Sequence, residues 1–406
     1  MSVYPAETIT IGSPFHSRTA PLNQTTWWYG WNGYLIPDVY TDPIGELSAV
    51  REAAAVIDMS PLPKFEISGP DAPQLIDYLI TRDSSKLEVN QIFYTPLCNE
   101  QGKLIADGLV FRIDEITYRL SLDNCFQWLV QNGRGYDVEV RDITDNFGLL
   151  ALQGPKAHEV LAAATGRDWS DLPFSRRRVT SIAGIEVDLA RQGFTGERGF
   201  ELWVRAKDGP DVWEAIWQAG QPFGLQAAGE YAIDIARVEA GLILVSADYT
   251  GAGPDPRCAD VPVDDKNHAS PFEMGLGRFI DFGGGDFIGK SALSEELDRG
   301  VSRQLVGLEI DWPQIVTAYT GQGLLPEISP RVRWDTLPAF LEDRRIGRAT
   351  SITWSPTLRR MIGFASLETA YAKKGANLKI HWPVGTGSSQ ITAKVVELPF
   401  IPSNRV

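Results

Sequence analysis

Cysteine and histidine are scarce in this chain. The three cysteines, Cys98, Cys125 and Cys258, lie far apart and form no CxxC pair, and none of the four histidines lies within ligand spacing of another. Disulfide-rich and zinc-binding domains need such residues in regular, closely spaced pairs. The sequence therefore predicts reduced thiols, no metal site and a cytoplasmic protein.

Long apolar runs and an excess of positive charge are also missing. No segment approaches the ~18–20 apolar residues that a membrane span requires. The first 13 residues lack a basic segment followed by an apolar one, so we expect neither membrane insertion nor a signal peptide. Lys and Arg number 38 against 52 Asp and Glu, and the net charge of −14 argues against binding of nucleic acid. These features leave the oligomeric state open.

Length and composition are typical of a soluble globular protein. One core rarely grows beyond roughly 250–300 residues, so 406 residues predict two or three domains. The spacing of apolar residues predicts α+β domains followed by a mostly β domain, a small barrel or sandwich. Predicted elements include a helix over Glu46–Ile57, two strands over Gln91–Leu97 and Leu104–Ile113, a helix over Tyr231–Ala240 and a loop over Ala252–Ser270.

Two acidic residues lie in apolar predicted strands. Asp107 lies within the run Leu104–Val110, and Glu201 lies between Phe200 and Leu202. A buried carboxylate needs a partner because desolvation is costly and raises its pKa. Asp107 is therefore a candidate catalytic group, and Glu201 would suit a ligand with paired N–H donors, such as a pterin ring. The residues alone leave open a solvated strand face for Asp107 and a surface ion pair for Glu201.

An aromatic cluster marks the N-terminal region. It includes Trp27, Trp28, Trp31 and Tyr34 on a segment punctuated by glycine. Such side chains could enclose a methylated cation or stack on an aromatic ring. They could equally form part of a core, provided that their polar tips are satisfied.

Residues Gly284–Ser291 match the pattern GxxxxGK[ST] of a phosphate-binding loop. A working loop of this kind follows a buried parallel strand and begins a helix. The mixed and later β-rich surroundings do not provide that sheet. We expect instead a turn that leads into a short helix.

Several other segments occur in a fixed order. They are Ala49–Ser60, Asn99–Val110, Leu150–Pro155 (LALQGP), Gly193–Glu201 (GFTGERGFE), Arg237–Leu242 (RVEAGL), Asp286–Lys290 (DFIGK), Ser351–Leu358 and Ala393–Phe400. Taken together they resemble the aminomethyltransferase family, which comprises the glycine cleavage T-protein and its folate-dependent demethylase relatives. The resemblance runs from about Ala49 to the end of the chain, and it rests on the number and order of the segments.

The resemblance implies a fold, an α+β cloverleaf of three domains around a central folate cleft, with a C-terminal β-barrel or jelly-roll-like domain. Residues 1–57 plus 148–232 would form the first domain. Residues 58–147 plus 233–290 would form the second, which holds the cleft, and residues 291–406 the third.

The resemblance also implies a site that binds tetrahydrofolate. Asp107 falls on the family's catalytic carboxylate, and Glu201 falls on its pterin-binding glutamate. Tyr94 matches a folate-site tyrosine, while Phe194 replaces the tyrosine of GYTGE. The remaining residues implied to contact the cofactor are Leu62 and Asp123, the latter where a one-residue gap puts the family's asparagine at Leu122 or Asp123.

Departures from the T-protein pattern shape the functional prediction. The histidine of DVSHM is absent from Asp58–Leu62, and Ile233 replaces an arginine. These losses, with the added tryptophans, favour a free small substrate over a lipoyl-bound one. The sequence thus predicts that the chain is a demethylase, closer to the demethylase members of the family than to the T-protein. It would move a one-carbon group from an N-, O- or S-methylated compound to tetrahydrofolate, with the aromatic cluster shaping the substrate pocket.

Two alternatives remain. One is a true glycine cleavage T-protein, active on an aminomethyl-lipoyl carrier protein. The other is a non-catalytic folate-binding relative that serves in iron–sulfur cluster maintenance. That group carries a reactive cysteine in a KGC motif, whereas Lys374-Gly375 has no adjacent cysteine, which counts against it.

Overall fold

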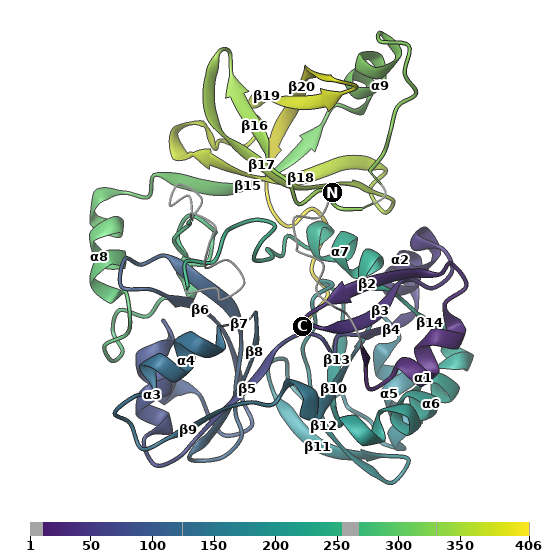
Figure 1. The fold of residues 1–406 in the computed structure, drawn as a ribbon, viewed down its shortest axis with the longest axis vertical. Helices are drawn as coiled ribbons and strands as arrows, with labels where there is room; N and C mark the ends of the chain where they lie inside the picture. The colour runs from purple at the N-terminus through teal and green to yellow at the C-terminus, as the bar shows by residue number, and fades with distance from the viewer. Residues whose placement is uncertain (1–10, 124, 254–267, 330, 406) are drawn as a thin grey trace.

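A computed structural model describes residues 11–123, 125–253, 268–329 and 331–405. The first ten residues, Cys258 and most of the predicted loop Ala252–Ser270 lie outside the described residues. The chain forms three lobes around a common centre, with a barrel at the top and two sheet-and-helix lobes below (Figure 1). None of the helices described is long and apolar enough to cross a membrane.

The lower right lobe is built on a six-stranded sheet in the order β11-β12-β13-β10-β4-β14. Its strands are β4 (Ala54–Asp58), β10 (Phe147–Gln153), β11 (Arg177–Ile182), β12 (Ile185–Ala190), β13 (Gly199–Arg205) and β14 (Leu225–Ala227). Helices α5 (Ala157–Thr165) and α6 (Gly209–Gly220) cover one face, where their apolar side chains join those of the strands in one core. The short helix α1 (His16–Thr19) and the small sheet of β1 (Ile11–Gly12), β2 (Trp27–Trp31) and β3 (Tyr34–Val39) complete the lobe.

The predicted helix over Glu46–Ile57 is wrong in its second half. Helix α2 spans Pro43–Glu52, where Asp42 caps its start by accepting a hydrogen bond from the backbone of Gly45. The chain then enters strand β4, which pairs with β10 on one side and β14 on the other. The alanines of this stretch suit a helix in isolation, and pairing in the middle of a sheet overrides that preference.

The lower left lobe holds a five-stranded sheet in the order β6-β7-β8-β5-β9. Its strands are β5 (Lys64–Ser68), β6 (Ile92–Cys98), β7 (Leu104–Arg112), β8 (Thr117–Leu122) and β9 (Glu139–Asp142). Helices α3 (Ala72–Leu79) and α4 (Phe126–Asn132) pack on one face of this sheet. Residues 59–63 carry the chain directly from β4 of one sheet to β5 of the other, so the two lobes meet at this connection.

The top lobe is a closed barrel in the order β15-β18-β17-β16-β19-β20. Its elements are β15 (Arg303–Ile310), α9 (Trp312–Thr320), β16 (Leu337–Leu341), β17 (Arg344–Ser355), β18 (Arg360–Glu368), β19 (Asn377–Val384) and β20 (Gly387–Val396). The predicted α+β fold with a C-terminal β-barrel is confirmed. The predicted domain boundaries stay a proposal; helix α7 (Glu230–Glu239) crosses the one at residue 232 and packs against both α2 and the barrel.

The phosphate-loop pattern is a turn followed by a helix, as expected. Lys290 begins α8 (Lys290–Arg299), and its ammonium donates to the carbonyls of Gly284 and Gly285 at 3.2 and 2.8 Å. The lysine is thus bound to its own loop, and the loop does not follow a strand of a parallel sheet.

Candidate functional site

Asp107 and Glu201 lie on surfaces of the two lower sheets that face each other. Leu109 and Phe111 of β7 and Trp203 of β13 belong to one apolar cluster, and the rings of Phe111 and Trp203 lie 5.3 Å apart. Side chains alternate along a strand, so Asp107 shares a face with Leu109, and Glu201 shares a face with Trp203. Both carboxylates therefore face the junction between the lobes.

Two tyrosines hold the Asp107 carboxylate. Asp107 pairs with Pro96 across the β6–β7 ladder, which puts Tyr94 on the same face. The hydroxyl of Tyr94 donates to one carboxylate oxygen, and the hydroxyl of Tyr249 donates to the other. Burial raises the pKa of Asp107, and the two hydroxyl donors oppose that rise. The two hydrogen bonds fix the orientation of the side chain, and they favour its ionised form against the effect of burial.

Tyr249 was not predicted from the sequence. It is fully buried and follows Asp248, which is also buried. Asp248 accepts hydrogen bonds from Arg237 of α7 and from Thr350 and Ser351 of the barrel. The loop that carries Tyr249 is thus held between lobes, and no local pattern of apolar residues marks it.

Strands β7 and β8 lie unusually close together beside Asp107. A Cβ atom built on Gly108 would lie 2.3 Å from Cβ of Leu122, so only glycine allows β7 and β8 to pair here. Asp123 follows Leu122 at the end of β8, and its charge raises the pKa of Asp107. The predicted Asp123 is therefore brought within electrostatic reach of the predicted catalytic group.

Glu201 is paired electrostatically with a lysine that sequence reasoning passed over. Burial raises the pKa of Glu201 to about 7, and Lys64 opposes that rise. Burial also lowers the pKa of Lys64 to about 7 against the charge of Asp58 and other carboxylates. The Lys64 ammonium donates to the carbonyls of Ser60 and Leu62 at 2.7 and 2.8 Å. Lys64 begins an apolar strand, so the same pattern that marked Asp107 as a buried charged residue also marked Lys64.

One carboxylate oxygen of Glu201 is buried and lacks a hydrogen-bond partner among the described residues. A buried acceptor without a donor is costly unless a ligand supplies one. The predicted contacts Leu62 and Phe194 are both partly buried, and each packs against an apolar cluster against which Met59 also packs. These features fit a ring that offers N–H groups to Glu201 and an apolar surface to its neighbours.

The aromatic cluster forms strands β2 and β3, and its side chains have separate surroundings. Trp27 is 49% exposed, and Trp28 packs against His16 at 5.3 Å. Tyr34 is buried and donates to Asp145 at 2.6 Å, while Trp31 is partly buried at the end of β2. Their contacts among the described residues do not reach Asp107, so their substrate-binding role stays a prediction.

Comparison with known proteins identifies the family. The family model described as the GCVT N-terminal domain matches residues 20–256, and that of the glycine cleavage T-protein C-terminal barrel domain matches residues 303–401. The chain is 34% identical to an aminomethyltransferase of Caldanaerobacter subterraneus subsp. tengcongensis over 86% of each protein. It is 32% identical to one of Listeria welshimeri over 96% of this chain and 98% of the relative.

The fold agrees with a solved structure. The crystal structure of the glycine cleavage system aminomethyltransferase T from Bartonella henselae superposes with a TM-score of 0.80 and covers 97% of this chain and 99% of that one, at 24% identity. The protein is a one-carbon transferase of the tetrahydrofolate-dependent type. It belongs to the aminomethyltransferase family. The names of these relatives favour the aminomethyl-transfer alternative over the predicted demethylase.

Proposed function

We propose that this chain transfers an aminomethyl-type carbon from an amine donor to tetrahydrofolate. N5 of tetrahydrofolate supplies the nucleophile that accepts the carbon. The observation that carries the proposal is the Asp107 carboxylate, oriented by the hydroxyls of Tyr94 and Tyr249. A fixed, ionised carboxylate stabilises positive charge that develops beside it, and it needs no rearrangement during the reaction. The homology to aminomethyltransferases supports the same reaction.

Glu201, Lys64 and Phe194 would bind the pterin. The free oxygen of Glu201 would accept N–H groups of the ring, and Phe194 would pack against it. Tyr94 would both hold Asp107 and border the cofactor. Because the transfer needs alignment more than covalent help, positioning of the two reactants would provide most of the rate enhancement.

A second candidate is demethylation of a small methylated compound. The specific observation in its favour is that the histidine and arginine of the T-protein pattern are replaced here by residues such as Ile233. A methyl group on an onium nitrogen or sulfur would then move to N5, and the leaving amine or sulfide would keep the electron pair of the broken bond.

One assay separates the two candidates. The purified chain is mixed with tetrahydrofolate and either an aminomethyl-lipoyl carrier protein or a panel of N-, S- and O-methyl compounds. Aminomethyl transfer breaks the carbon–sulfur bond and gives 5,10-methylenetetrahydrofolate, ammonia and the reduced carrier. Demethylation gives 5-methyltetrahydrofolate and the demethylated donor. Failure of both donor classes, with an intact fold, contradicts the proposed function.

Glu201→Gln is expected to remove the fall in folate affinity below pH 7. The ionised carboxylate accepts the ring N–H groups, and its pKa is about 7. Since protonation removes the acceptor, affinity of the wild type should rise as pH increases towards 7 and level off above it. Each pH unit below 7 should weaken binding by about tenfold. Titrations with 5-formyltetrahydrofolate between pH 5.5 and 8 measure this.

In the Glu201→Gln variant the affinity should be lower at neutral pH and should no longer fall tenfold per pH unit below pH 7. Glu342→Gln, at an exposed hairpin position of the barrel, is the matched control and should titrate as the wild type does. An unchanged pH profile in the Glu201→Gln variant would contradict the assignment.

Tyr249→Phe is expected to shift the pH profile of turnover towards higher pH. Loss of the hydroxyl removes a donor that lowers the pKa of Asp107, so the carboxylate ionises later. We expect roughly a tenfold lower kcat/KM at neutral pH, the size of one hydrogen bond to a charged group. Tyr319→Phe, which removes a weak bond to a barrel carbonyl, is the control. A uniform loss of rate with no pH shift would indicate only a packing role for Tyr249.

A further inference from the structure

Two arginines and two phenylalanines lie among the residues that line a cavity beside the edge strand β6. The volume of this cavity is about 360 Å³, at the lower end of the range for small-molecule sites. Arg82 and Phe93 come from the lower left lobe, and Arg278 and Phe279 belong to the short 3-10 helix η7 (Gly277–Phe279). Cationic and aromatic side chains thus meet at a place that the proposed function does not use.

Thr81 joins the two segments that carry the arginines. Its hydroxyl donates to the carbonyl of Phe279 at 2.9 Å, and its carbonyl accepts from the backbone N–H of Asp281 at 2.8 Å. Thr81 is fully buried, and Arg82 follows it directly. Because Arg278 precedes Phe279, the two arginines extend from segments that are hydrogen-bonded to each other.

Both guanidinium groups lie against aromatic rings. The Cζ atom of Arg82 is 3.6 Å from the centre of the Phe93 ring and 5.8 Å from the centre of the Phe279 ring. The Cζ atom of Arg278 is 4.7 Å from the centre of the Phe279 ring. Stacking covers the flat face of a guanidinium and leaves the N–H groups at its edge for an acceptor. The two arginines therefore share the Phe279 ring as a support.

The carboxylates that line the cavity are already bound by other groups. Lys86 pairs with Asp83 at 3.1 Å and with Asp281 at 2.7 Å. The other oxygen of Asp83 accepts from the backbone N–H of Ser85 at 3.1 Å, and the other oxygen of Asp281 accepts from that of Gly283 at 2.9 Å. Every oxygen of these two carboxylates thus has a donor that is not an arginine.

Neither arginine forms an ion pair within the part of the chain that the structure describes. Arg82 is partly buried and donates to the carbonyl of Tyr94 at 3.3 Å, and Arg278 is exposed. By contrast, the buried Arg51 and Arg237 each bind two carboxylates. A cation that is partly removed from water is normally paired, so an anionic ligand would stabilise this arrangement.

The cavity adjoins the proposed reaction site. The rings of Tyr94 and Phe279 lie 5.0 Å apart, nearly edge to face. The Tyr94 hydroxyl donates to Asp107. A single ring contact therefore separates the support of the two arginines from the residue that holds the proposed catalytic carboxylate.

We propose that Arg82 and Arg278 form a second binding site, which takes an extended ligand with more than one carboxylate group. The guanidinium fork matches the two oxygens of a carboxylate, and two forks around one ring suit carboxylates that follow one another along a chain. Two sources supply this chemistry. One is tetrahydrofolate that carries additional γ-linked glutamyl residues, and this source rests on the proposed function. The other is a free small polycarboxylate, which does not.

Folate titrations test the first source. 5-Formyltetrahydrofolate with one and with five glutamyl residues is titrated into the wild type, Arg82→Gln, Arg278→Gln and the double variant. The wild type should bind the pentaglutamate about 10- to 100-fold more tightly than the monoglutamate. The double variant should lose this preference, and Arg278→Gln should lose part of it. Because Arg278 is exposed, that variant keeps the test decisive if Arg82 is needed for folding.

Titration with citrate, a tricarboxylate without a pterin, tests the second source. A free polycarboxylate is the ligand if the wild type binds citrate, the double variant does not, and the wild type shows no preference for the pentaglutamate. This titration needs neither folate nor turnover, so it stands even if the proposed function fails. Arg344→Gln, an exposed arginine paired with Glu368 on the barrel, should match the wild type with every probe.

Two results overturn the proposal. One is a wild type that neither prefers the pentaglutamate nor binds citrate. The other is a folded double variant that matches the wild type with both probes, since the arginines would then take no part in the binding. A preference that the double variant loses should also shrink in about 1 M salt, where charges are screened within about 3 Å.

Discussion

Replacing Asp107 with Asn is expected to lower kcat by about 10²- to 10³-fold while folate binding persists. Asparagine keeps the shape of the side chain and loses the negative charge. Tyr94 and Tyr249 now donate to both carboxylate oxygens, and only one oxygen remains in the amide. The variant therefore loses the charge that stabilises developing positive charge, and one of the two hydroxyl groups loses its acceptor.

The measurement is single-turnover rate and folate affinity on the same preparation. Asp343→Asn, an exposed change of the same kind in the hairpin between β16 and β17, is the matched control and should leave both unchanged. Persistence of the wild-type rate in Asp107→Asn would contradict the assignment of Asp107 as the catalytic carboxylate. Loss of folate affinity alone would mean that Asp107 binds the cofactor and does not act in the chemical step.

Local patterns were sufficient for many elements of the fold. The turn after Cys98 with strands on each side, and helix α7 with Gly241 at its end, follow from residues that are close in sequence. The helix prediction failed at Ala54–Asp58 because the strands that pair with it, β10 and β14, come about 90 and 170 residues later. The strands β2 and β3 were seen only as an aromatic cluster, since exposure along β2 does not alternate cleanly.

The residues of the candidate site fall into the same two groups, those marked by the local sequence and those placed by distant contacts. Asp107, Tyr94 and Glu201 lie in strands whose apolar neighbours made them conspicuous, and ordered motifs singled them out. Tyr249 depends on a loop tied to Arg237 and the barrel through Asp248. Its position is set by contacts between lobes, and contacts of that kind leave no periodic signal in a sequence.

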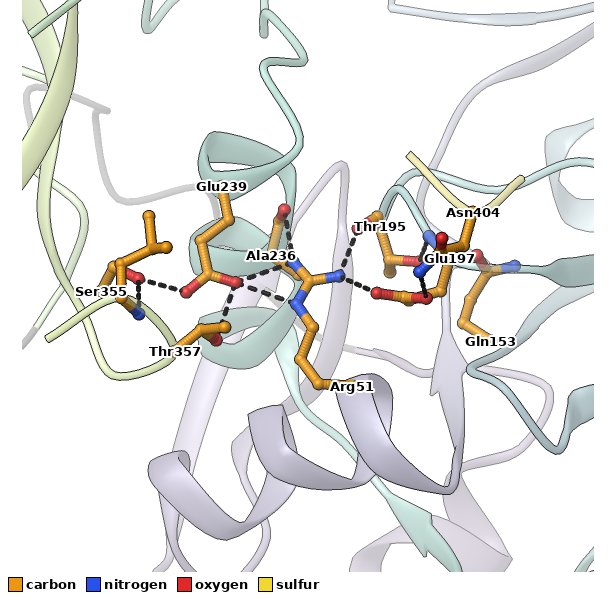
Figure 2. A network of polar contacts seen from close by, with 10 residues as sticks. Arg51, Gln153, Thr195, Glu197, Ala236, Glu239, Ser355, Thr357 and Asn404 are labelled. Atoms are coloured by element: carbon orange, nitrogen blue, oxygen red, sulfur yellow. Dashed lines mark hydrogen bonds and ion pairs between the residues drawn. The ribbon is translucent and has the colours of Figure 1, made fainter. Parts of the chain in front are cut away.

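Arg51→Met is expected to reduce the free energy of unfolding by about 3–5 kcal/mol. Arg51 is 8% exposed and binds Glu239 at 2.8 Å and Glu197 at 3.0 Å. It also donates to the carbonyls of Thr195 and Ala236 at 2.7 and 3.0 Å (Figure 2). Methionine would leave two buried carboxylates without their cation. Urea titration followed by tryptophan fluorescence measures the loss, and Arg360→Met, an exposed ion pair, should cost no more than about 1 kcal/mol.

The same substitution has a structural consequence beyond Arg51 itself, because Arg51 links the lower right lobe to the barrel through Glu239. Glu239 also accepts hydrogen bonds from Ser355 and Thr357 of the barrel, and Glu197 accepts one from Asn404 of the C-terminal segment. Weakening Arg51 should therefore loosen residues 400–405 before the lobes unfold, because this segment is held through Glu239 and Glu197, the two carboxylates that Arg51 binds. Under native conditions Arg51→Met should show faster amide exchange at residues 400–405 than Arg360→Met. Equal exchange in the two variants would mean that Arg51 stabilises the lobes without holding the C-terminal segment.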